Sequence, residues 1–326
     1  SECMTIVKPL ISILIAVYEP RMDWLRAQLE SLEAQTYPNL RLYIRDDCSS
    51  RIALAEIDKL AKECIHSFPY KLEKNGENLG SNLTFQRLTE EAEGEYFAYC
   101  DQDDVWLPGK LTALQEEAER TGALLVCSDM YIIDGEGRQT ADSITKIRKR
   151  HVFRSGENLA EGLVFRNFAT GCTMLVKSAA AKGAVPFCPY MVHDHYIALY
   201  CAEQGTVQCL AQPLIRYRIH GGNQTNLLSG VTDKKSYGLV RITGMKKRLM
   251  WLEKNFPCGE LLKRTLRECV LWLEARERNW AHCGGKRQIW KYRRFSPVTS
   301  LFELLADRMP ESLFQLCVMA VKRNLV

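Results

Sequence analysis

Tyr96-Phe97-Ala98-Tyr99-Cys100-Asp101-Gln102-Asp103-Asp104 joins a short apolar run directly to an acidic cluster. Residues 95–100 have the length and composition of a strand that is buried on both faces, as in the interior of a parallel sheet. The acidic cluster begins where that strand ends. This stretch therefore predicts a buried strand with three carboxylates at its carboxyl end.

The residues before this stretch alternate strand-like and helix-like segments. Strands are predicted at 11–17, 40–44 and 70–73, and helices at 21–35, 51–67 and 82–92. Such alternation predicts an α/β fold, with a mostly parallel sheet flanked by helices. Ligands of these sheets bind at the carboxyl ends of the strands. Tyr18-Glu19 and Asp46-Asp47 fall at two further strand ends, so we expect three polar clusters to converge.

After residue 122 the alternation weakens. Strands are predicted at 123–128, 131–133, 171–176 and 214–219, a helix at 193–203, and a surface loop at 141–156. Amphipathic helical stretches follow at 241–255, 262–273, 299–308 and 311–323. We therefore predict an α/β domain over residues 1–229 and a helical, basic C-terminal subdomain over residues 230–326.

The composition narrows the class of protein. The 13 cysteines include no C-x-x-C pair, and many lie in apolar runs, which is typical of buried free thiols in a reducing compartment. A structural zinc site is not expected from this spacing. No apolar run approaches the ~20 residues of a membrane-spanning helix, and no signal peptide is evident. We expect a cytoplasmic protein.

The formal net charge of +5 conceals an asymmetry between the two parts of the chain. Residues 231–326 carry a net +11 and residues 1–230 a net −6. One interpretation is a solvated helical face. The other is a peripheral membrane contact at the inner face of the cell membrane, through Trp272, Trp280, Trp290 and the basic residues beside them. Nucleic acid is not an expected partner, because no recognition motif accompanies the charge.

Each polar cluster has two interpretations when it is taken alone. Asp101 to Asp104 can bind a hard cation such as Mg²⁺ or Mn²⁺, or form a solvated turn that caps the helix near Pro108. Asp46-Asp47 can accept hydrogen bonds from a nucleoside, or serve as a turn and helix cap. The loop from Asn75 to Asn82 can supply amide contacts or be a simple turn.

A second polar set combines His193-Asp194-His195 with the distant His220. Two histidines around an aspartate suggest zinc, but residues two apart on a helix do not easily face one metal. An aspartate in apolar surroundings suits a general base better. His220 can be a metal or phosphate ligand, or a plain loop histidine.

Several motifs in one order resemble glycosyltransferase family 2, and especially its bacterial rhamnosyltransferase-like branch. The resemblance extends over residues ~10–225 and rests on segments 13–18, 46–49, 75–80, 97–111, 170–175, 193–194 and 213–223. It implies the GT-A fold, which is Rossmann-like, and a nucleotide-sugar donor. The chain departs from the family at His193, where much of the family has Glu, and at His195, where this branch often has an aromatic residue.

The resemblance also implies roles for individual residues. The implied nucleotide-sugar contacts are Ala16, Tyr18, Glu19, Asp46, Asp47, Asn78, Asp101 and Asp103. Asp103 and His220 would bind Mg²⁺ or Mn²⁺, Asp194 would be the catalytic base, and Asp104 would support the site. A metal stabilises charge on the leaving diphosphate. One base and one displacement imply inversion at the anomeric carbon.

The leading hypothesis is an inverting, metal-dependent hexosyltransferase that acts in bacterial surface-polysaccharide assembly on a glycan or lipid-linked acceptor. The resemblance favours dTDP-rhamnose as donor, with a UDP-hexose as the alternative. A catalytically inactive nucleotide- or glycan-binding module is a second hypothesis. A zinc-dependent hydrolase built on His193, Asp194, His195 and His220 is a third.

Overall fold

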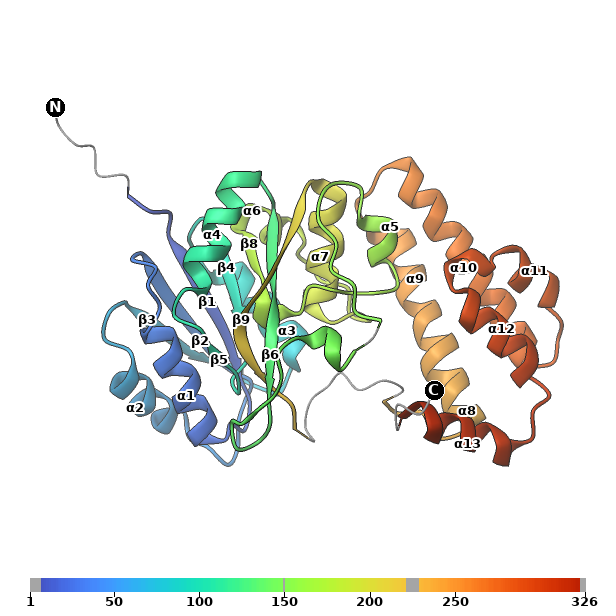
Figure 1. Cartoon of the computed structure of the whole chain (residues 1–326), viewed down its shortest axis with the longest axis horizontal. Coiled ribbons are helices and arrows are strands. Elements are labelled where there is room, and N and C mark those ends of the chain that lie inside the picture. Colours follow the sequence, from blue (N-terminus) through green and yellow to red (C-terminus); the bar gives the residue numbers. More distant parts are fainter. Residues whose placement is uncertain (1–6, 149, 221–228, 323–326) are drawn as a thin grey trace. The chain divides into compact units, whose positions relative to one another are not determined.

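A computed structural model describes residues 7–148, 150–220 and 229–322. The chain divides into two compact units (Figure 1). Unit 1 comprises residues 1–187 and 191–221, and unit 2 comprises residues 188–190 and 222–326. The predicted boundary at residue 229 stays a prediction, because residues 221–228 lie outside the described residues.

In the described residues of unit 1, nine strands form one mixed sheet around which helices pack (Figure 1). The strands are β1 (Ile11–Val17), β2 (Leu40–Asp46), β3 (Tyr70–Lys74), β4 (Tyr96–Cys100), β5 (Val105–Trp106), β6 (Leu125–Ile133), β7 (Gln139–Ala141), β8 (Leu175–Lys177) and β9 (Val207–Arg218). Their order is β3-β2-β1-β4-β8-β6-β9-β5, with β7 paired to β6. Strands β1 to β4 run parallel to one another, whereas β8 lies antiparallel to both β4 and β6.

The register of the parallel strands brings the predicted polar clusters to one edge. Val17 of β1 lies opposite Asp46 of β2, and Ile15 of β1 lies opposite Cys100 of β4. The residues that follow these strands therefore emerge side by side, as expected for the carboxyl ends of parallel strands. These are the Tyr18-Glu19, Asp47 and Asp101 positions of the predicted site.

Helices cover both faces of the sheet, as the alternation of segments predicts (Figure 1). The core between the sheet and α1, α2 and α4 contains Ile13, Leu29, Ile57 and Leu114, all fully buried. The helices are α1 (Met22–Glu33), α2 (Leu54–Cys64), α3 (Ser81–Glu91), α4 (Lys110–Thr121), α5 (Ala160–Leu163), α6 (Ser178–Gly183) and α7 (His193–Gln204). The predicted α/β fold with a helical C-terminal region is thus confirmed, although its sheet is mixed.

The second half of unit 1 differs locally from the sequence-based expectations. The strand predicted at 171–176 is a 3-10 turn, η2 (Gly171–Thr173), followed by the short β8. The two strands predicted at 123–128 and 131–133 are one strand, β6, with a register shift after Ser128. The loop predicted at 141–156 includes the last residue of β7 and the 3-10 turn η1 (Ile144–Lys146).

Unit 2 is helical in its described residues. Its elements are α8 (Lys234–Tyr237), the π-helical segment η3 (Gly238–Thr243), α9 (Gly244–Asn255), α10 (Glu260–Trp280), α11 (Lys286–Lys291), η4 (Arg293–Phe295), α12 (Pro297–Ala306) and α13 (Glu311–Lys322). Arg276 of α10 and Glu303 of α12 form a buried ion pair with two hydrogen bonds, of 2.6 and 2.8 Å. In the described parts of the chain no helix is long and apolar enough to cross a membrane.

Candidate functional site

The loop that follows β4 is fastened to the end of β1 by one side-chain amide. Gln102 Oε1 accepts a hydrogen bond of 2.8 Å from the backbone N–H of Tyr18, and Gln102 Nε2 donates one of 3.0 Å to the Tyr18 carbonyl. The two bonds fix the acidic loop against the loop after β1. The Tyr18 ring itself is half exposed, so it remains available to a ligand.

Asp103 and His220 meet at the mouth of a hollow. Asp103 Oδ2 lies 2.7 Å from His220 Nε2, and both side chains are partly exposed. The hollow has a volume of about 250 Å³, and its lining residues are Glu19, Arg21, Trp24, Gln102, Asp103 and His220. We call it the donor hollow. The structure thus brings three predicted site residues, Glu19, Asp103 and His220, into one concave surface.

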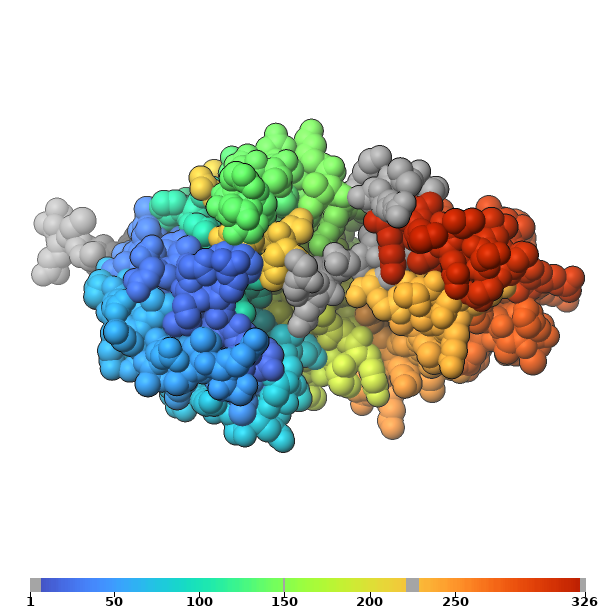
Figure 2. Space-filling view, turned by 90° about the horizontal axis from the view of Figure 1, so that it is seen from below, coloured from blue at the N-terminus to red at the C-terminus, as the bar shows by residue number. Residues whose placement is uncertain are grey.

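The wall of the donor hollow is held by Trp24 and by the end of β9. Trp24 Nε1 donates a hydrogen bond of 3.2 Å to the Gly135 carbonyl, and the His220 ring lies 4.9 Å from the Trp24 ring. In the space-filling view the residues near 140 (green) accordingly lie beside α1 (dark blue) (Figure 2). Arg218 Nε donates to the Asp103 carbonyl at 2.8 Å, and the Arg218 N–H donates to Asp104 Oδ1 at 2.9 Å.

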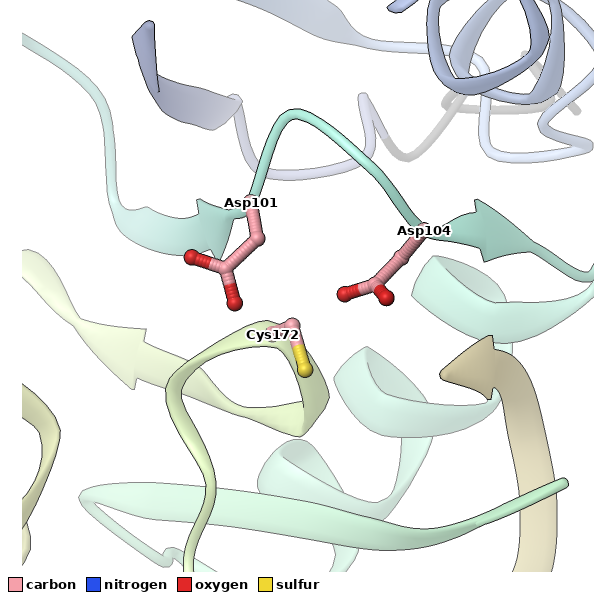
Figure 3. A group of neighbouring side chains, drawn as sticks. All are labelled: Asp101, Asp104 and Cys172. Carbon is pink, nitrogen blue, oxygen red and sulfur yellow. The ribbon is translucent and has the colours of Figure 1, made fainter. Parts of the chain in front are cut away.

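Behind Asp103 lies a buried polar cluster. Asp101 and Asp104, at the two ends of the acidic loop, both point toward Cys172 of η2 (Figure 3). Each of the three offers a ligand atom within 4.8 Å of the others. The Lys110 side chain is fully buried in the same region, where its Nζ donates to the Cys172 carbonyl and lies 3.2 Å from the centre of the Trp106 ring.

Burial and the neighbouring charges shift the pKa values of the acidic and basic groups in this cluster. Burial, together with the neighbouring Asp103 and Asp194 carboxylates, raises the pKa of Asp101 to about 7. Burial lowers the pKa of Lys110 to about 8, although Asp104 and Asp101 counteract this. A lysine ammonium already supplies positive charge here, and a thiol is a poor ligand for Mg²⁺ or Mn²⁺. Asp101, Asp104 and Cys172 therefore suit a lysine-neutralised cluster better than a second cation site.

Asp194 is presented by the first turn of α7. Its Oδ2 accepts a hydrogen bond of 2.8 Å from the Gly171 N–H, and its Oδ1 accepts one of 3.3 Å from Asn167 Nδ2. Burial raises the pKa of Asp194 to about 6, against the opposing effect of the Gly171 N–H. A carboxylate with such a pKa is ionised at neutral pH but remains basic enough to accept a proton. The charge of Asp194 also contributes to the raised pKa of Asp101.

The histidines beside Asp194 point to other partners. The His193 ring stacks on Phe85 with 4.0 Å between ring centres, and burial lowers the pKa of His193 to about 3. His195 Nε2 is 2.5 Å from the Leu163 carbonyl. Within the described residues, neither joins His220 in a group of three ligand atoms. A zinc site made of these histidines therefore has no geometric support.

Asp47 anchors the loop that leads into α3. Its two carboxylate oxygens accept hydrogen bonds from Asn75 Nδ2 (2.9 Å), the Leu79 N–H (2.7 Å), Asn78 Nδ2 (3.2 Å) and the Gly80 N–H (2.8 Å). Four donors occupy about as many acceptor positions as a carboxylate has. Asp47 and Asn78 thus shape the loop, and their predicted contacts with a nucleotide stay predictions.

The remaining predicted residues lie at the ends of β1 and β2. Asp46 is fully buried and accepts hydrogen bonds from the Ser49 N–H at 3.0 Å and the Ser49 hydroxyl at 2.5 Å. Glu19 has a φ of 41°, and its carboxylate accepts hydrogen bonds from the N–H groups of Ser50 and Arg51. The Ser50 N–H is the main reason that the pKa of Glu19 is lowered. Ala16 is partly buried. Glu19 lines the donor hollow, whereas Asp46 and Ala16 do not.

The ligand atoms at the donor hollow fit a divalent cation. A carboxylate oxygen and an imidazole nitrogen that are 2.7 Å apart can converge on one ion, and both side chains face the hollow. Carboxylates suit Mg²⁺ and Mn²⁺ alike, whereas an imidazole ligand is more common for transition metals. The residues present therefore fit the predicted Mg²⁺ or Mn²⁺.

The sequence predicted no site role for Gln102, Lys110, Asn167 and Arg218, nor for Arg21 and Trp24, which line the donor hollow. Gln102 lies inside the acidic cluster, and this position could have indicated that it belongs to the site. Lys110 gave no signal, because a lysine near the start of an amphipathic helix is normally solvated. Asn167 and Arg218 act through partners distant in sequence, which no local pattern identifies.

This chain is similar in sequence to a known protein family and to individual proteins. The sequence model of the family described as Glycosyl transferase family 2 matches residues 12–183. A UDP-Glc:alpha-D-GlcNAc-diphosphoundecaprenol beta-1,3-glucosyltransferase of Escherichia coli is 29% identical over 71% of this chain and 90% of that protein. The matched family region includes every predicted site residue up to Asp103.

Two solved structures share the fold. Staphylococcus aureus TarS in complex with UDP-GlcNAc has a TM-score of 0.56 at 15% identity, over 81% of this chain and 72% of that chain. A mannosyltransferase of Pyrobaculum calidifontis in complex with GDP-Man and Mn²⁺ has a TM-score of 0.54 at 12% identity, over 95% and 84% of the two chains. At these identities the likeness concerns the fold alone.

Proposed function

Since this chain belongs to glycosyl transferase family 2, we propose that it is an inverting transferase whose base is Asp194 and whose donor occupies the hollow at Asp103 and His220. The supporting observation is the position of the Asp194 carboxylate, which is partly buried in the first turn of α7 and is held by hydrogen bonds from the Gly171 N–H and from Asn167. Burial accordingly raises the pKa of Asp194 to about 6. A solvated surface aspartate would have none of these properties.

The proposed reaction is a single displacement. An acceptor hydroxyl oxygen attacks the anomeric carbon of the donor sugar, and the bond from that carbon to the β-phosphate oxygen breaks. The hydroxyl proton passes to Asp194, and the nucleoside diphosphate leaves with the bonding electron pair. A single attack from the face opposite the leaving group inverts the configuration at the anomeric carbon.

The protein contributes position and charge to this step. The Gly171 N–H and Asn167 orient the Asp194 carboxylate, so that one oxygen can face the acceptor hydroxyl. Gln102, through its two hydrogen bonds to the Tyr18 backbone, and Arg218, through its hydrogen bond to the Asp103 carbonyl, hold Asp103 at the donor hollow. Asp103 and His220 would hold a divalent cation, which when bound stabilises negative charge on the leaving diphosphate.

We propose two nucleotide sugars as candidates for the donor. The resemblance of the Asp101 to Pro108 segment to rhamnosyltransferase-like proteins favours dTDP-rhamnose. The E. coli relative is named for UDP-Glc, which favours a UDP-hexose. Because the name of a relative that matches 71% of this chain and 90% of its own length carries more weight than one motif, we propose the UDP-hexose first and dTDP-rhamnose second.

We place the enzyme in assembly of a bacterial surface polysaccharide, at the inner face of the cell membrane. One relative is named for a diphosphoundecaprenol acceptor, and another for teichuronic acid biosynthesis. Unit 2 exposes apolar side chains on α12 and α13, among them Leu301, Leu305 and Leu316, and residues 231–326 carry a net charge of +11. Of the three tryptophans considered for membrane contact, Trp290 is half exposed but Trp272 is buried.

The test is a donor screen followed by product analysis. The full chain is incubated with Mn²⁺ or Mg²⁺ and each of UDP-Glc, UDP-GlcNAc and dTDP-rhamnose, and thermal stability reports binding because a ligand stabilises the folded state. NMR of the product or of the hydrolysed donor then gives the anomeric configuration. Inversion supports the proposal. Donor binding without turnover of any donor would favour a nucleotide-binding module instead, and retention would exclude the single displacement.

A further inference from the structure

A second hollow in unit 1 is built by one continuous stretch of chain, residues 150–168. It has a volume of about 190 Å³ and is lined by three arginines, Arg150, Arg154 and Arg166, and by two asparagines, Asn158 and Asn167, among others. No aspartate or glutamate of the described residues lines it. We call it the arginine hollow.

The charges of the arginine hollow are not neutralised by the protein. All three arginines are exposed, and within the described part of the chain none of their guanidinium groups has an ion-pair or hydrogen-bond partner. The two glutamates of the same stretch, Glu157 and Glu161, are exposed and are not among the lining residues. Three like charges around one concavity repel each other, so an anion that enters it is attracted by all three.

The arginine hollow is one side chain away from the proposed base. Asn167 lines the hollow, and its Nδ2 is 3.3 Å from Asp194 Oδ1. The same side chain is fixed by the Ala169 backbone, whose N–H donates to Asn167 Oδ1 at 2.9 Å. Asn167 therefore lies between Asp194 and the hollow, and its hydrogen bonds restrict the rotation of its side chain. By contrast, no residue is shared by the arginine hollow and the donor hollow.

The chemistry of the lining selects the kind of anion. A guanidinium presents paired N–H groups that match the oxygens of phosphate or carboxylate. The three positive charges of the guanidinium groups exceed the single negative charge of a carboxylate. They match the larger negative charge of a phosphate monoester or diphosphate better. The Asn158 amide adds a neutral donor for a remaining oxygen. Both N–H groups of Asn167 are already used, because they donate to Asp194 Oδ1 and to the Ala169 carbonyl.

We propose that the arginine hollow binds a phosphate or diphosphate group of the acceptor, next to Asp194. This inference rests on the proposed function, because it takes Asp194 as the base that meets the acceptor hydroxyl. The acceptor is then a phosphorylated glycan. The phosphate can belong to a lipid diphosphate or to a soluble sugar phosphate, and both present the same group to the arginines.

Calorimetry with inorganic pyrophosphate, in EDTA and without divalent metal, tests the site directly. The proposal predicts that the double variant Arg154→Ala, Arg166→Ala binds pyrophosphate at least about tenfold more weakly than wild type, since a hydrogen bond to a charged group contributes a factor of that size. Arg154→Lys with Arg166→Lys should give an intermediate loss, because charge remains without the paired geometry. Arg120→Ala, at an exposed arginine of α4, is the matched control and should bind as wild type does. Equal affinity in wild type and the double alanine variant would overturn the proposal, as would glucuronate binding as tightly as pyrophosphate.

Two further probes distinguish the sources of the phosphate. Farnesyl diphosphate represents a lipid diphosphate, and N-acetylglucosamine 1-phosphate represents a soluble sugar phosphate. The probe with the higher affinity for wild type identifies the source, and its affinity should fall in the double alanine variant. If the variant loses affinity for neither probe, the assignment to an acceptor phosphate is wrong.

The binding of UDP with Mn²⁺ separates this inference from the proposed function. The double alanine variant should bind UDP with Mn²⁺ as wild type does, because the donor hollow shares no residue with the arginine hollow. If wild type itself failed to bind any nucleoside diphosphate, the proposed function would fall while the pyrophosphate result still stood. A parallel loss of UDP and pyrophosphate affinity in the variant would instead assign the arginines to the donor.

Discussion

His220 Nε2 lies 2.7 Å from Asp103 Oδ2, although 117 positions separate the two residues in the sequence. Asp103 belongs to the loop after β4, whereas His220 follows β9. The fold thus joins the two parts of the predicted metal site through strands that lie apart in the sheet. Aspartate and histidine are each common on protein surfaces. Together at the donor hollow, these two side chains offer an oxygen and a nitrogen ligand atom to one cation.

Replacing His220 tests that pair. His220→Ala removes one of the two proposed ligands, so the Mn²⁺ concentration for half-maximal donor turnover should rise by on the order of tenfold or more. The measurement is an Mn²⁺ titration of activity, with His66→Ala, at an exposed histidine of unit 1, as the control. An unchanged Mn²⁺ requirement in His220→Ala would remove His220 from the metal site.

Gln102 is expected to be a positioning residue for the donor hollow. Gln102→Glu keeps the size of the side chain but replaces the N–H donor with an oxygen, which then faces the Tyr18 carbonyl. The free energy of unfolding should fall by about 1–3 kcal/mol, and the KM for the donor should rise. Urea unfolding and donor kinetics measure the two effects. Gln139→Glu, on the exposed β7, should change neither; equal effects at both positions would contradict the assigned role.

Asp47 is expected to order the loop into α3. Asp47→Ala leaves the N–H groups of Leu79 and Gly80 without their acceptor, which should cost about 3 kcal/mol of folding free energy. Hydrogen exchange of these two amides should accelerate strongly, while exchange in β4 follows only the global loss. Asp142→Ala, at an exposed aspartate, is the control. Unaltered exchange at Leu79 and Gly80 would show that the loop does not depend on Asp47.

The raised pKa of Asp194 has a consequence for stability. The carboxyl has a pKa of about 6 in the folded protein, against an ordinary value of 3.8, so the folded state holds the proton more tightly. Its contribution to stability is therefore present below pH 3.8 and is lost as the pH rises through 6. Relative to wild type, Asp194→Asn should gain up to about 3 kcal/mol between pH 4 and pH 7, since one pKa unit corresponds to about 1.4 kcal/mol. If the free energies of unfolding of the two proteins changed with pH by the same amount, Asp194 would be solvated in the folded protein.

Much of the fold could be predicted because its signals are local. The apolar run Ile11–Val17 and the helical spacing of residues such as Leu25 and Leu29 depend on each segment alone, and both elements form as expected. The convergence of the Tyr18-Glu19, Asp47 and Asp101 positions follows from parallel strand register, which the alternation of segments implies. The resemblance to the family implied the residue roles, which no local pattern contains and which stay predictions.

The parts that sequence reasoning missed depend on long-range partners. The apolar segment from Gly171 to Val176 looks like a strand, but the Gly171 N–H is bonded to Asp194, and the chain forms a 3-10 turn there. Lys110 is buried where its Nζ donates to the Cys172 carbonyl and where the charges of Asp104 and Asp101 counteract the effect of burial on its pKa. Arg218 is the last residue of β9, yet its partners Asp103 and Asp134 come from two other loops. Such contacts exist only in the folded chain.

The pH dependence of kcat/KM in wild type and Asp194→Asn tests the central claim, that Asp194 is the base, most directly. For wild type, with a donor found in the screen, log kcat/KM should rise with a slope near one below pH 6 and level off above it, because only the ionised carboxylate accepts the proton. Asp194→Asn should lose roughly 10²–10⁴-fold of this activity and the rise near pH 6, while it still binds UDP with Mn²⁺ and stays folded. A folded Asp194→Asn protein with wild-type kcat/KM and the same pH profile would contradict the account.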